Sequence, residues 1–477
     1  MSLPEEFISY TRKMMGDALF SRLSEGLQSP SVTSVRINPE KKLEQGVSFS
    51  SDDTTRQVTA VPWCKDGYYL SSRPNFTFDP SLHAGAYYVQ EAASMFVDHV
   101  VRQHIHHPVL MLDLCAAPGG KSTALRAALP EGSLLVCNEP IHQRANILME
   151  NMQKWGHPDV MVTQATPAEY RRSGLHFDAI LADVPCSGEG MFRKDTKAID
   201  EWSVQNVLRC QQLQREIVAD AWSCLRPGGL FIYSTCTFNT KENEENIGWM
   251  MEEFGAEVLA TETHEEWGIT GSLLPTLQMP VYRFIPGVSR GEGLFMAVLR
   301  KKGDRQSILE SHQATKGNKH KSKMRQPASP KDKKNISIED WIEGHSTYAF
   351  YEQGEVVRAI HHWWKHIYDR MKGLRVLHAG IEVASLRGRD YLPCHALALS
   401  TVLRRSMFEE YAASYEEAIR YLRREAIALP SDLKRGFVII TYQGLPLGFV
   451  KHLGNRANNL YPQEWRIMSQ LKNGGDK

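Results

Sequence analysis

The sequence predicts a doubly wound α/β fold in the middle of the chain, with a separate folded unit on either side. Between Val109 and Arg300, short apolar runs alternate with glycine turns and amphipathic stretches, the strand, turn and helix pattern of a parallel sheet covered on both faces. A basic segment with few apolar residues then separates this region from the rest of the chain, and 477 residues suffice for about three domains. We predict four divisions: an accessory unit at 1–90, the α/β domain at 91–301, a linker at 302–335 and a C-terminal domain at 336–477.

The elements of the α/β domain follow one another at short intervals. The expected strands are VLMLDL (109–114), SLLVCNE (133–139), FDAILADVP (177–185), GGLFIYSTCT (228–237) and LFMAVLRK (294–301). The expected helices lie at 121–129, 141–156 and 204–225, the last of them ended by the Pro and two Gly residues of LRPGG.

The flanking regions carry weaker signals. The N-terminal unit alternates short helical and extended patterns and contains Arg36 within SVRINPEK. Residues 301–334 hold eleven Lys/Arg against three Asp/Glu, which predicts a basic linker that is either a solvated spacer or a contact to phosphates. Beyond it we expect helices around Trp363 and at 415–426, and a β-hairpin formed by 437–442 and GFVKHL.

Composition excludes several classes of protein. With 56 Lys+Arg and 55 Asp+Glu, net charge gives no indication of a nucleic-acid partner. The eight cysteines are spread singly without CxxC pairs, which favours reduced thiols over disulfides or structural zinc, and HHWWKH at 361–366 lacks a second ligand cluster, so no metal is expected. The N-terminus is acidic and then amphipathic, and no run of about 18 apolar residues occurs; we therefore expect a cytoplasmic protein without a membrane partner.

The segment LDLCAAPGGKSTAL, residues 112–125, joins a strand to a helix through a glycine turn. Its end resembles a phosphate-binding loop, but Cys115 stands where that motif needs its first glycine, and Pro118 removes a backbone donor. A nucleoside-bearing cofactor fits better, because the next strand ends at Glu139, whose carboxylate could accept hydrogen bonds from ribose hydroxyls. Taken alone, an acidic residue such as Glu139 is more often part of a solvated loop, and only its position after the glycine turn favours the ribose contact.

Two cysteines, Cys186 and Cys236, each follow an apolar run that reads as a buried parallel strand. Ligands of open α/β sheets bind outside the carboxyl ends of the strands, so both thiols and the nearby Asp183 should face one pocket. A cysteine at the end of a core strand is more often an inert small hydrophobe, which is how we interpret the other six. The two differ from those six because both lie in short polar turns.

The motifs PGGKST, DVPCSGEG and STCT followed by NxxENE resemble the Sun-type RNA (cytosine-5) methyltransferases. AGAYYVQEAASM before the core and RGEGLFMAVLRK after it match the same family, so the resemblance runs from about Gly85 to Lys301. The full layout, with GFVKHLGNRANNLYPQEWRI near the end, is similar to the F type of the bacterial ribosomal small-subunit RNA methyltransferases. The resemblance implies a Rossmann-like core dependent on S-adenosyl-L-methionine, an N-terminal α+β unit and a PUA-like RNA-binding module at about 425–475.

The resemblance also implies roles for the two thiols. Carbon 5 of cytosine is too weak a nucleophile to take the methyl group, so a thiolate must first add to carbon 6. The family pattern assigns this step to Cys236 and release of the adduct to Cys186; in the DNA enzymes the nucleophile resembles the cysteine of the Pro-Cys segment instead. Asp183 would stabilise the adduct at ring nitrogen 3 as a general acid, and Lys121 would supply positive potential.

The cofactor contacts implied by the resemblance are carried by three segments. Glu139 would hold the ribose, Asp183 would lie at the edge shared by cofactor and base, and Thr166 stands where the family usually has an acidic residue near the adenine. The residues expected around the methionine moiety are Cys115, Ala116, Ala117, Pro118, Gly119, Gly120 and Lys121.

RNA, most simply small-subunit (16S) ribosomal RNA, is the expected partner, with the target base taken out of its stack. Arg36, the basic linker, Lys451 and Arg456 are candidate backbone contacts, although ordinary surface charge explains each equally well. A transfer-RNA methyltransferase would use the same chemistry. A P-loop nucleotidase or a catalytically silent RNA-binding factor would leave the paired cysteines unexplained.

Overall fold

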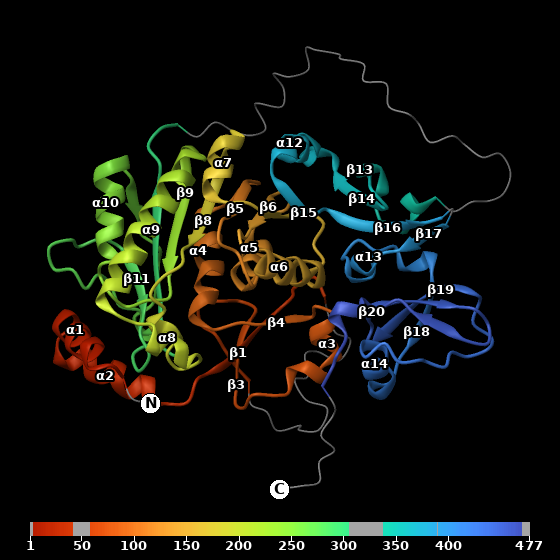
Figure 1. The fold of residues 1–477 in the computed structure, drawn as a ribbon, viewed down its shortest axis with the longest axis horizontal. Helices are drawn as coiled ribbons and strands as arrows, with labels where there is room; N and C mark the ends of the chain where they lie inside the picture. Colours follow the sequence, from red (N-terminus) through yellow and green to blue (C-terminus); the bar gives the residue numbers. More distant parts are fainter. Residues whose placement is uncertain (1–2, 42–57, 305–336, 389, 470–477) are drawn as a thin grey trace, which may run out of the picture.

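A computed structural model describes residues 3–41, 58–304, 337–388 and 390–469, and most of the predicted basic linker lies outside these residues. The elements form a central sheet with helices on both faces, a small N-terminal unit beneath it and two further sheets beside it (Figure 1).

The central sheet has nine strands in the order β10-β12-β9-β8-β5-β6-β7-β15, with β11 paired to β12. Its middle is parallel and consists of β9 (Leu225–Thr235), β8 (Phe177–Asp183), β5 (Leu110–Asp113), β6 (Leu134–Asn138) and β7 (Val160–Gln164). The antiparallel edge consists of β10 (Glu257–Leu259), β11 (Val281–Phe284) and β12 (Leu294–Arg300). The predicted strands are all confirmed, whereas β7 was not predicted.

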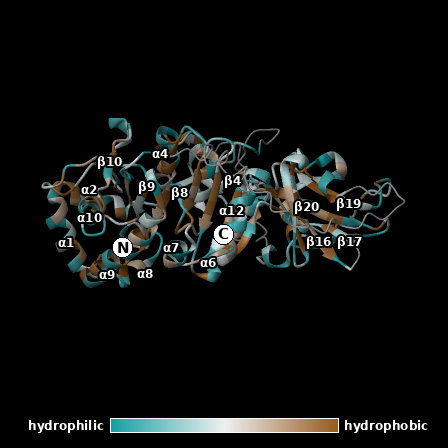
Figure 2. Ribbon diagram, turned by 90° about the horizontal axis from the view of Figure 1, so that it is seen from above, coloured by the Kyte–Doolittle hydropathy of each residue, from teal (hydrophilic) through white to brown (hydrophobic). Residues whose placement is uncertain are grey.

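Helices cover both faces of this sheet, as the doubly wound pattern requires. Side chains alternate between the faces: Met111 and Leu135 pack on one side, and Leu112 and Val136 on the other. The first face is covered by α4 (Phe96–His104), α5 (Gly120–Ala128) and α6 (His142–Trp155). The second is covered by α7 (Pro167–Ser173), α9 (Val204–Ser223) and α10 (Glu244–Phe254). The strands at the centre are coloured mainly hydrophobic in Figure 2.

One strand of the central sheet comes from beyond the predicted linker. β15 (Arg375–Ala379) pairs antiparallel with β7, with Arg375 opposite Gln164 and Ala379 opposite Met161. Ala379 is fully buried in the same core as Leu112. The predicted domain boundary at residue 336 therefore separates β15 from β7, although the two strands pair in one sheet.

The N-terminal unit contains two helices, α1 (Glu5–Met15) and α2 (Asp17–Gln28), and a four-stranded sheet. The strand order is β2 (Val58–Ala60), β3 (Gly67–Leu70), β1 (Thr33–Ile37) and β4 (Tyr87–Val89). Between β3 and β4 lies the short helix α3 (Pro80–His83), which faces α14 (Tyr415–Leu422) and β20 (Leu445–His452) of the C-terminal region (Figure 1).

The prediction that Arg36 contacts RNA is wrong. Its side chain on β1 is fully buried. It donates a hydrogen bond from Nε to Oε1 of Gln90 at 2.8 Å and another from Nη2 to Oγ1 of Thr123 at 2.5 Å. The guanidinium lies 4.6 Å from the ring centroid of Trp155. Arg36 thus joins the N-terminal sheet to α5 and α6 instead of meeting a ligand at the surface.

The C-terminal region holds two four-stranded sheets. The first is β13 (Tyr348–Gln353), β14 (Val356–His361), β16 (Ile381–Arg387) and β17 (Asp390–Pro393); the second is β18 (Glu409–Ala412), β19 (Gly436–Tyr442), β20 (Leu445–His452) and β21 (Ala457–Asn459). The accompanying helices are α12 (Lys365–Arg370), α13 (His395–Leu399) and α14 (Tyr415–Leu422). The predicted hairpin is confirmed as β19 and β20, with Gln443 and Gly444 at positive φ in the turn. No helix in the described ranges is long and apolar enough to cross a membrane.

Candidate active site

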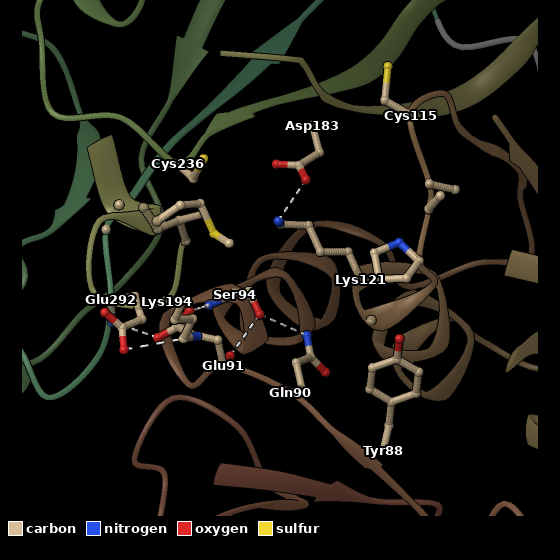
Figure 3. A pocket seen from close by; sticks show the side chains of 18 of the residues that line it. Tyr88, Gln90, Glu91, Ser94, Cys115, Lys121, Asp183, Lys194, Cys236 and Glu292 are labelled. Carbon is tan, nitrogen blue, oxygen red and sulfur yellow. Dashed lines mark hydrogen bonds and ion pairs between the residues drawn. The ribbon is translucent and has the colours of Figure 1, made fainter. Parts of the chain in front are cut away.

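A pocket of about 350 Å³ lies at the carboxyl ends of β5, β8 and β9, where the strand order of the sheet reverses direction. Figure 3 shows Asp183 and Cys236 on one side of it, Lys121 near its centre, and Tyr88 and Gln90 on the opposite side. Its wall includes residues from the glycine turn, the two cysteine segments and the N-terminal strand β4.

The glycine turn forms one wall. After β5 ends at Asp113, the chain turns through Gly119, whose φ of 115° favours glycine, and α5 begins at Gly120. A Cβ on Gly120 would lie 3.3 Å from Cε1 of Tyr88, so the small residue brings the backbone close to β4. Of the seven residues predicted around the methionine moiety, the pocket wall contains Cys115, Ala116, Ala117, Pro118, Gly120 and Lys121.

An ion pair crosses the pocket from α5 to β8. Nζ of Lys121 lies 2.8 Å from Oδ2 of Asp183, and Oγ of Ser234 donates to Oδ1 of Asp183 at 2.6 Å. Burial by itself would lower the pKa of Lys121, but the Asp183 carboxylate outweighs it and the pKa is raised. Lys121 therefore keeps a positive charge beside Asp183 at neutral pH.

The two cysteine sulfurs lie 3.0 Å apart, and both thiols are free. Cys236 is in the pocket wall, whereas Cys186 lies behind it and accepts from the backbone N–H of Cys236 at 3.4 Å. The hydrogen bond with Cys236, together with burial, raises the pKa of Cys186 well above its ordinary value. Cys186 is thus held as a thiol directly behind the sulfur that faces the pocket.

Behind the sulfurs lies a carboxylate clamp made of Glu189, Asn239 and Glu242, all of them fully buried. Glu189, from the Cys186 segment, accepts the backbone N–H groups of Phe238 at 2.6 Å and Asn239 at 3.1 Å. Glu242, from the Cys236 segment, accepts the backbone N–H of Ser187 at 3.0 Å. The Asn239 amide donates to both carboxylates, at 3.1 Å and 2.8 Å. Each segment therefore holds the backbone of the other.

Two further contacts join the Cys186 segment to the Cys236 segment. The backbone N–H of Gly190 donates to the carbonyl of Cys236 at 2.7 Å, and the hydroxyls of Ser187 and Thr237 lie 2.9 Å apart. Burial, and then the nearby charge of Glu189, raises the pKa of Glu242 to about 7. The clamp thus contains a carboxyl that titrates near neutral pH.

Glu139 and Thr166 lie outside the pocket wall. Glu139 is almost fully buried, accepts the backbone N–H of Ile141 at 3.0 Å and lies 3.4 Å from Nη2 of Arg144. Thr166 caps α7: its hydroxyl donates to Oε2 of Glu169 at 2.8 Å and accepts the Glu169 backbone N–H at 3.3 Å. The Thr166 hydroxyl therefore already has partners in the helix cap, and its contact with adenine stays a prediction.

Sequence reasoning missed the contribution of the N-terminal unit. Tyr88, Gln90 and Glu91 bring three polar side chains from β4 and the segment after it into the pocket wall, and Glu292 lies on the same wall. The AGAYYVQEAASM motif was the available signal, because it contains Tyr88, Gln90 and Glu91. Asp113 was also missed: burial raises its pKa to about 7, and its Oδ1 has no hydrogen-bond partner in the described part of the chain.

The two remaining predicted RNA contacts lie near the end of the chain. Lys451 is half-buried on β20, with Nζ 5.6 Å from the Phe437 ring centroid, and Arg456 is exposed just before β21. Both stay predictions. Within the described ranges no group of three or more His, Cys, Asp or Glu is arranged to hold a metal ion.

Three family models match the chain in order. The model described as the N-terminal domain of 16S rRNA methyltransferase RsmF matches residues 3–92, that of 16S rRNA methyltransferase RsmB/F matches 103–300, and that of the methyltransferase RsmF PUA domain matches 408–467.

Similar proteins include several that are named ribosomal RNA small subunit methyltransferase F. The protein from Enterobacter sp. (strain 638) is 27% identical, over 97% of this chain and 95% of its own length. That from Citrobacter koseri is 28% identical, over 99% and 98% respectively. That from Pectobacterium atrosepticum is 32% identical over 63% of each chain.

Solved structures share the fold over about two thirds of the chain. NSun6 from Pyrococcus horikoshii, solved with SFG, superposes with a TM-score of 0.54 at 20% identity and covers 63% of this chain and 99% of its own. A methyltransferase homologue from the same organism gives a TM-score of 0.50 at 25% identity, covering 63% and 100%.

Proposed function

The chain belongs to the family of 16S rRNA methyltransferases RsmB/F, with the domain layout of its F type, and we propose that it methylates carbon 5 of a cytosine through a covalent adduct with Cys236. It is an S-adenosylmethionine-dependent methyltransferase of small-subunit ribosomal RNA. The proposal concerns the atom that is methylated and the residues that act. The observation that carries it is the pair of free thiols, 3.0 Å apart, beside Asp183 at the pocket.

The pocket residues fit the cofactor. S-Adenosylmethionine, when bound, supplies an electrophilic methyl group next to a cationic sulfur and an ammonium group. The buried Asp113 carboxyl offers an oxygen without a partner among the described residues at the pocket wall, which suits a cationic group. Gly120, which has no side chain and is partly exposed, lies in the pocket wall, so the first residue of α5 presents its backbone to a polar ligand there.

Cys236 is the thiol that can reach the base, because its side chain is in the pocket wall. Its sulfur would bond to carbon 6 of the cytosine and push electron density onto carbon 5, which then takes the methyl group. Release requires loss of the carbon 5 proton to a base; the C–H electron pair re-forms the ring double bond, and the Cys236 sulfur leaves. Cys186, held as a thiol 3.0 Å away, can give that sulfur a proton.

Lys121 and Asp183 would stabilise the adduct. Adding a thiolate to the ring places negative charge on the base, which a proton at nitrogen 3 neutralises. Since Asp183 is ion-paired with Lys121 at 2.8 Å, we assign this proton to the pair. The hydrogen bond from Ser234 then holds the Asp183 carboxyl in one orientation.

The proposal is tested by incubating the protein with methyl-labelled S-adenosylmethionine and RNA from a strain lacking it, followed by identification of the labelled RNA and base. Labelled 5-methylcytosine in small-subunit ribosomal RNA is expected. Label in transfer RNA would move the substrate while keeping the chemistry, and another labelled base would contradict the mechanism. Absence of label from both RNAs and from isolated subunits would favour a silent RNA-binding factor.

Two variants separate the roles of the thiols. Cys236→Ala should abolish both product and covalent adduct, whereas Cys186→Ala should accumulate protein attached to RNA, seen as a shifted band on a denaturing gel. Cys210→Ala is the matched control, since Cys210 is a partly exposed cysteine on α9 outside the pocket wall. Equal, adduct-free loss in both active-site variants would refute the assignment.

A further inference from the structure

A second cavity of about 200 Å³ adjoins the active-site pocket and takes no part in the proposed chemistry. Tyr88 and Val89 of β4 line both spaces, so one short strand separates them. The remaining walls are Leu82, Gly85, Tyr87, Asn151, Lys154 and Trp155.

The size of the second cavity limits its occupant. Sites for whole small-molecule ligands usually measure roughly 300–1,000 Å³, and the active-site pocket, at about 350 Å³, falls in that range. A cavity of about 200 Å³ instead suits a single group, such as one planar ring. Because it shares a wall with the active-site pocket, that group can belong to the same molecule that occupies the pocket.

The lining has the chemistry that single-stranded RNA requires. Tyr88 is partly exposed and supplies an aromatic ring on which a base can stack, and the almost fully buried rings of Tyr87 and Trp155 complete the apolar wall. The Asn151 amide donates to the carbonyl of Pro118 at 2.8 Å and lies 3.4 Å from the Tyr88 hydroxyl, which leaves its carbonyl oxygen available to a base edge. Lys154 adds an ammonium group at the same wall.

The cavity also lies beside the C-terminal module. Nζ of Lys154 is 5.1 Å from the ring centroid of Trp465, and the Tyr461 hydroxyl is 3.4 Å from Nδ1 of His83, the residue after Leu82. An RNA strand that leaves the active-site pocket along β4 would therefore pass the second cavity before it reaches the module that the PUA family model matches.

We infer that the second cavity binds the base of a nucleotide adjacent to the target cytosine, so that the enzyme reads two neighbouring positions of one RNA strand. This inference rests on the proposed function. With the target base turned into the active-site pocket, the neighbouring base loses a stacking partner. The aromatic lining of the second cavity replaces that partner and fixes the position of the flipped nucleotide.

The test uses the full-length protein and the shortest small-subunit ribosomal RNA fragment that it methylates. Equilibrium binding is measured for the intact fragment and for fragments with an abasic residue 5′ of the target, 3′ of it, or at a distant position. One of the two adjacent abasic residues should weaken binding about 5- to 150-fold, the range expected for one stacked base. Wild-type binding that is insensitive to both adjacent positions would overturn the inference.

A variant that fills the second cavity tests whether the effect of the abasic residue depends on this cavity. Leu82 lines the second cavity and not the active-site pocket, so Leu82→Trp should weaken binding of the intact fragment to the level of the abasic one. The abasic residue should then cause no further loss. Leu208→Trp, an exposed leucine on α9, is the matched control. The same abasic effect in Leu82→Trp and wild type would overturn the inference.

A measurement on the wild-type protein keeps the test decisive if Leu82→Trp does not fold. Fragments with 4-thiouridine at either adjacent position are irradiated, and the cross-linked peptides are mapped. One position should cross-link to residues 82–89 or 151–155, and cross-linking of both positions elsewhere would overturn the inference. Methyl transfer to the intact fragment is measured in parallel, so failure of the proposed function appears as loss of transfer, independently of the binding pattern.

Discussion

Replacing Glu242 by Gln should change the pH dependence of stability. Burial raises the pKa of Glu242 from 4.5 to about 7. A carboxyl whose pKa is raised on folding binds its proton more tightly in the folded state, so its contribution to stability is greatest below pH 4.5 and is lost as the pH rises through 7. At about 1.4 kcal/mol per pKa unit, the wild-type protein should lose roughly 3 kcal/mol across this window through Glu242.

Glu242→Gln removes this titration. The glutamine keeps one acceptor oxygen in the place of Oε2. This oxygen can still accept the two hydrogen bonds that Oε2 accepts, from the Ser187 N–H at 3.0 Å and from the Gln214 amide at 2.6 Å. Its new NH₂ group meets the Asn239 amide that donates to Oε1 at 2.8 Å, and this conflict costs about 1–3 kcal/mol at every pH. The variant is therefore expected to be less stable than the wild type at pH 4.5, and to recover most or all of that difference by pH 8.

The measurement is the free energy of unfolding from denaturant titrations at pH 4.5 to 8. Glu253→Gln is the control, because Glu253 is exposed on α10, the helix that begins two residues after Glu242. The difference between Glu242→Gln and wild type should vary by roughly 3 kcal/mol over the range, while the control follows the wild type. Parallel curves for all three proteins would show that Glu242 does not titrate near neutral pH and would refute the reasoning.

Three other substitutions test separate contacts. Lys121→Gln should reduce single-turnover methyl transfer at least about 100-fold, since a positioned proton donor contributes on that order; activity within twofold of wild type would remove Lys121 from the mechanism. Gly190→Ala places a Cβ 2.5 Å from the Cys236 carbonyl oxygen and should lower both the melting temperature and the rate of adduct formation on a denaturing gel, whereas Gly271→Ala, with open space around its Cβ, should change neither. Arg36→Ala should lower the free energy of unfolding by about 2–4 kcal/mol and leave the salt dependence of RNA binding unchanged; unchanged stability with a flatter salt dependence would restore it as an RNA contact.

The central sheet was largely predictable from the sequence because its strands are buried on both faces. Such strands form continuous apolar runs. β5, β6 and β8 lie within predicted runs, and β9 overlaps one but begins three residues before it. β7 was missed because Val160–Gln164 is short and ends in polar residues, and its burial depends on β15 from far along the chain. Hydrophobic periodicity and composition reflect only neighbouring residues in the sequence. They therefore cannot reveal a partner strand that lies more than two hundred residues away.

The residues of the candidate site were predictable where a sequence motif marks a backbone turn. They were not predictable where a residue's role depends on the burial and partners of its side chain. The glycine turn and the carboxyl ends of β8 and β9 brought Lys121, Asp183 and Cys236 to one pocket. Arg36 was misassigned because charge in a sequence does not reveal burial, and its partners, Gln90 and Thr123, lie on other elements. The carboxylate clamp was visible only as the NxxENE motif; its reciprocal hydrogen bonds depend on the tertiary structure.

The position of β15 at the edge of the catalytic sheet bears on how the protein can fold during synthesis. Until Arg375–Ala379 leaves the ribosome, the outer backbone groups of β7 have no strand to pair with, and an open edge of this kind invites pairing with other chains. At 5–20 residues per second, the interval between the emergence of β7 and that of β15 is roughly ten to forty seconds. A truncated catalytic domain ending after β12 would keep this edge open permanently, and we expect such a fragment to aggregate.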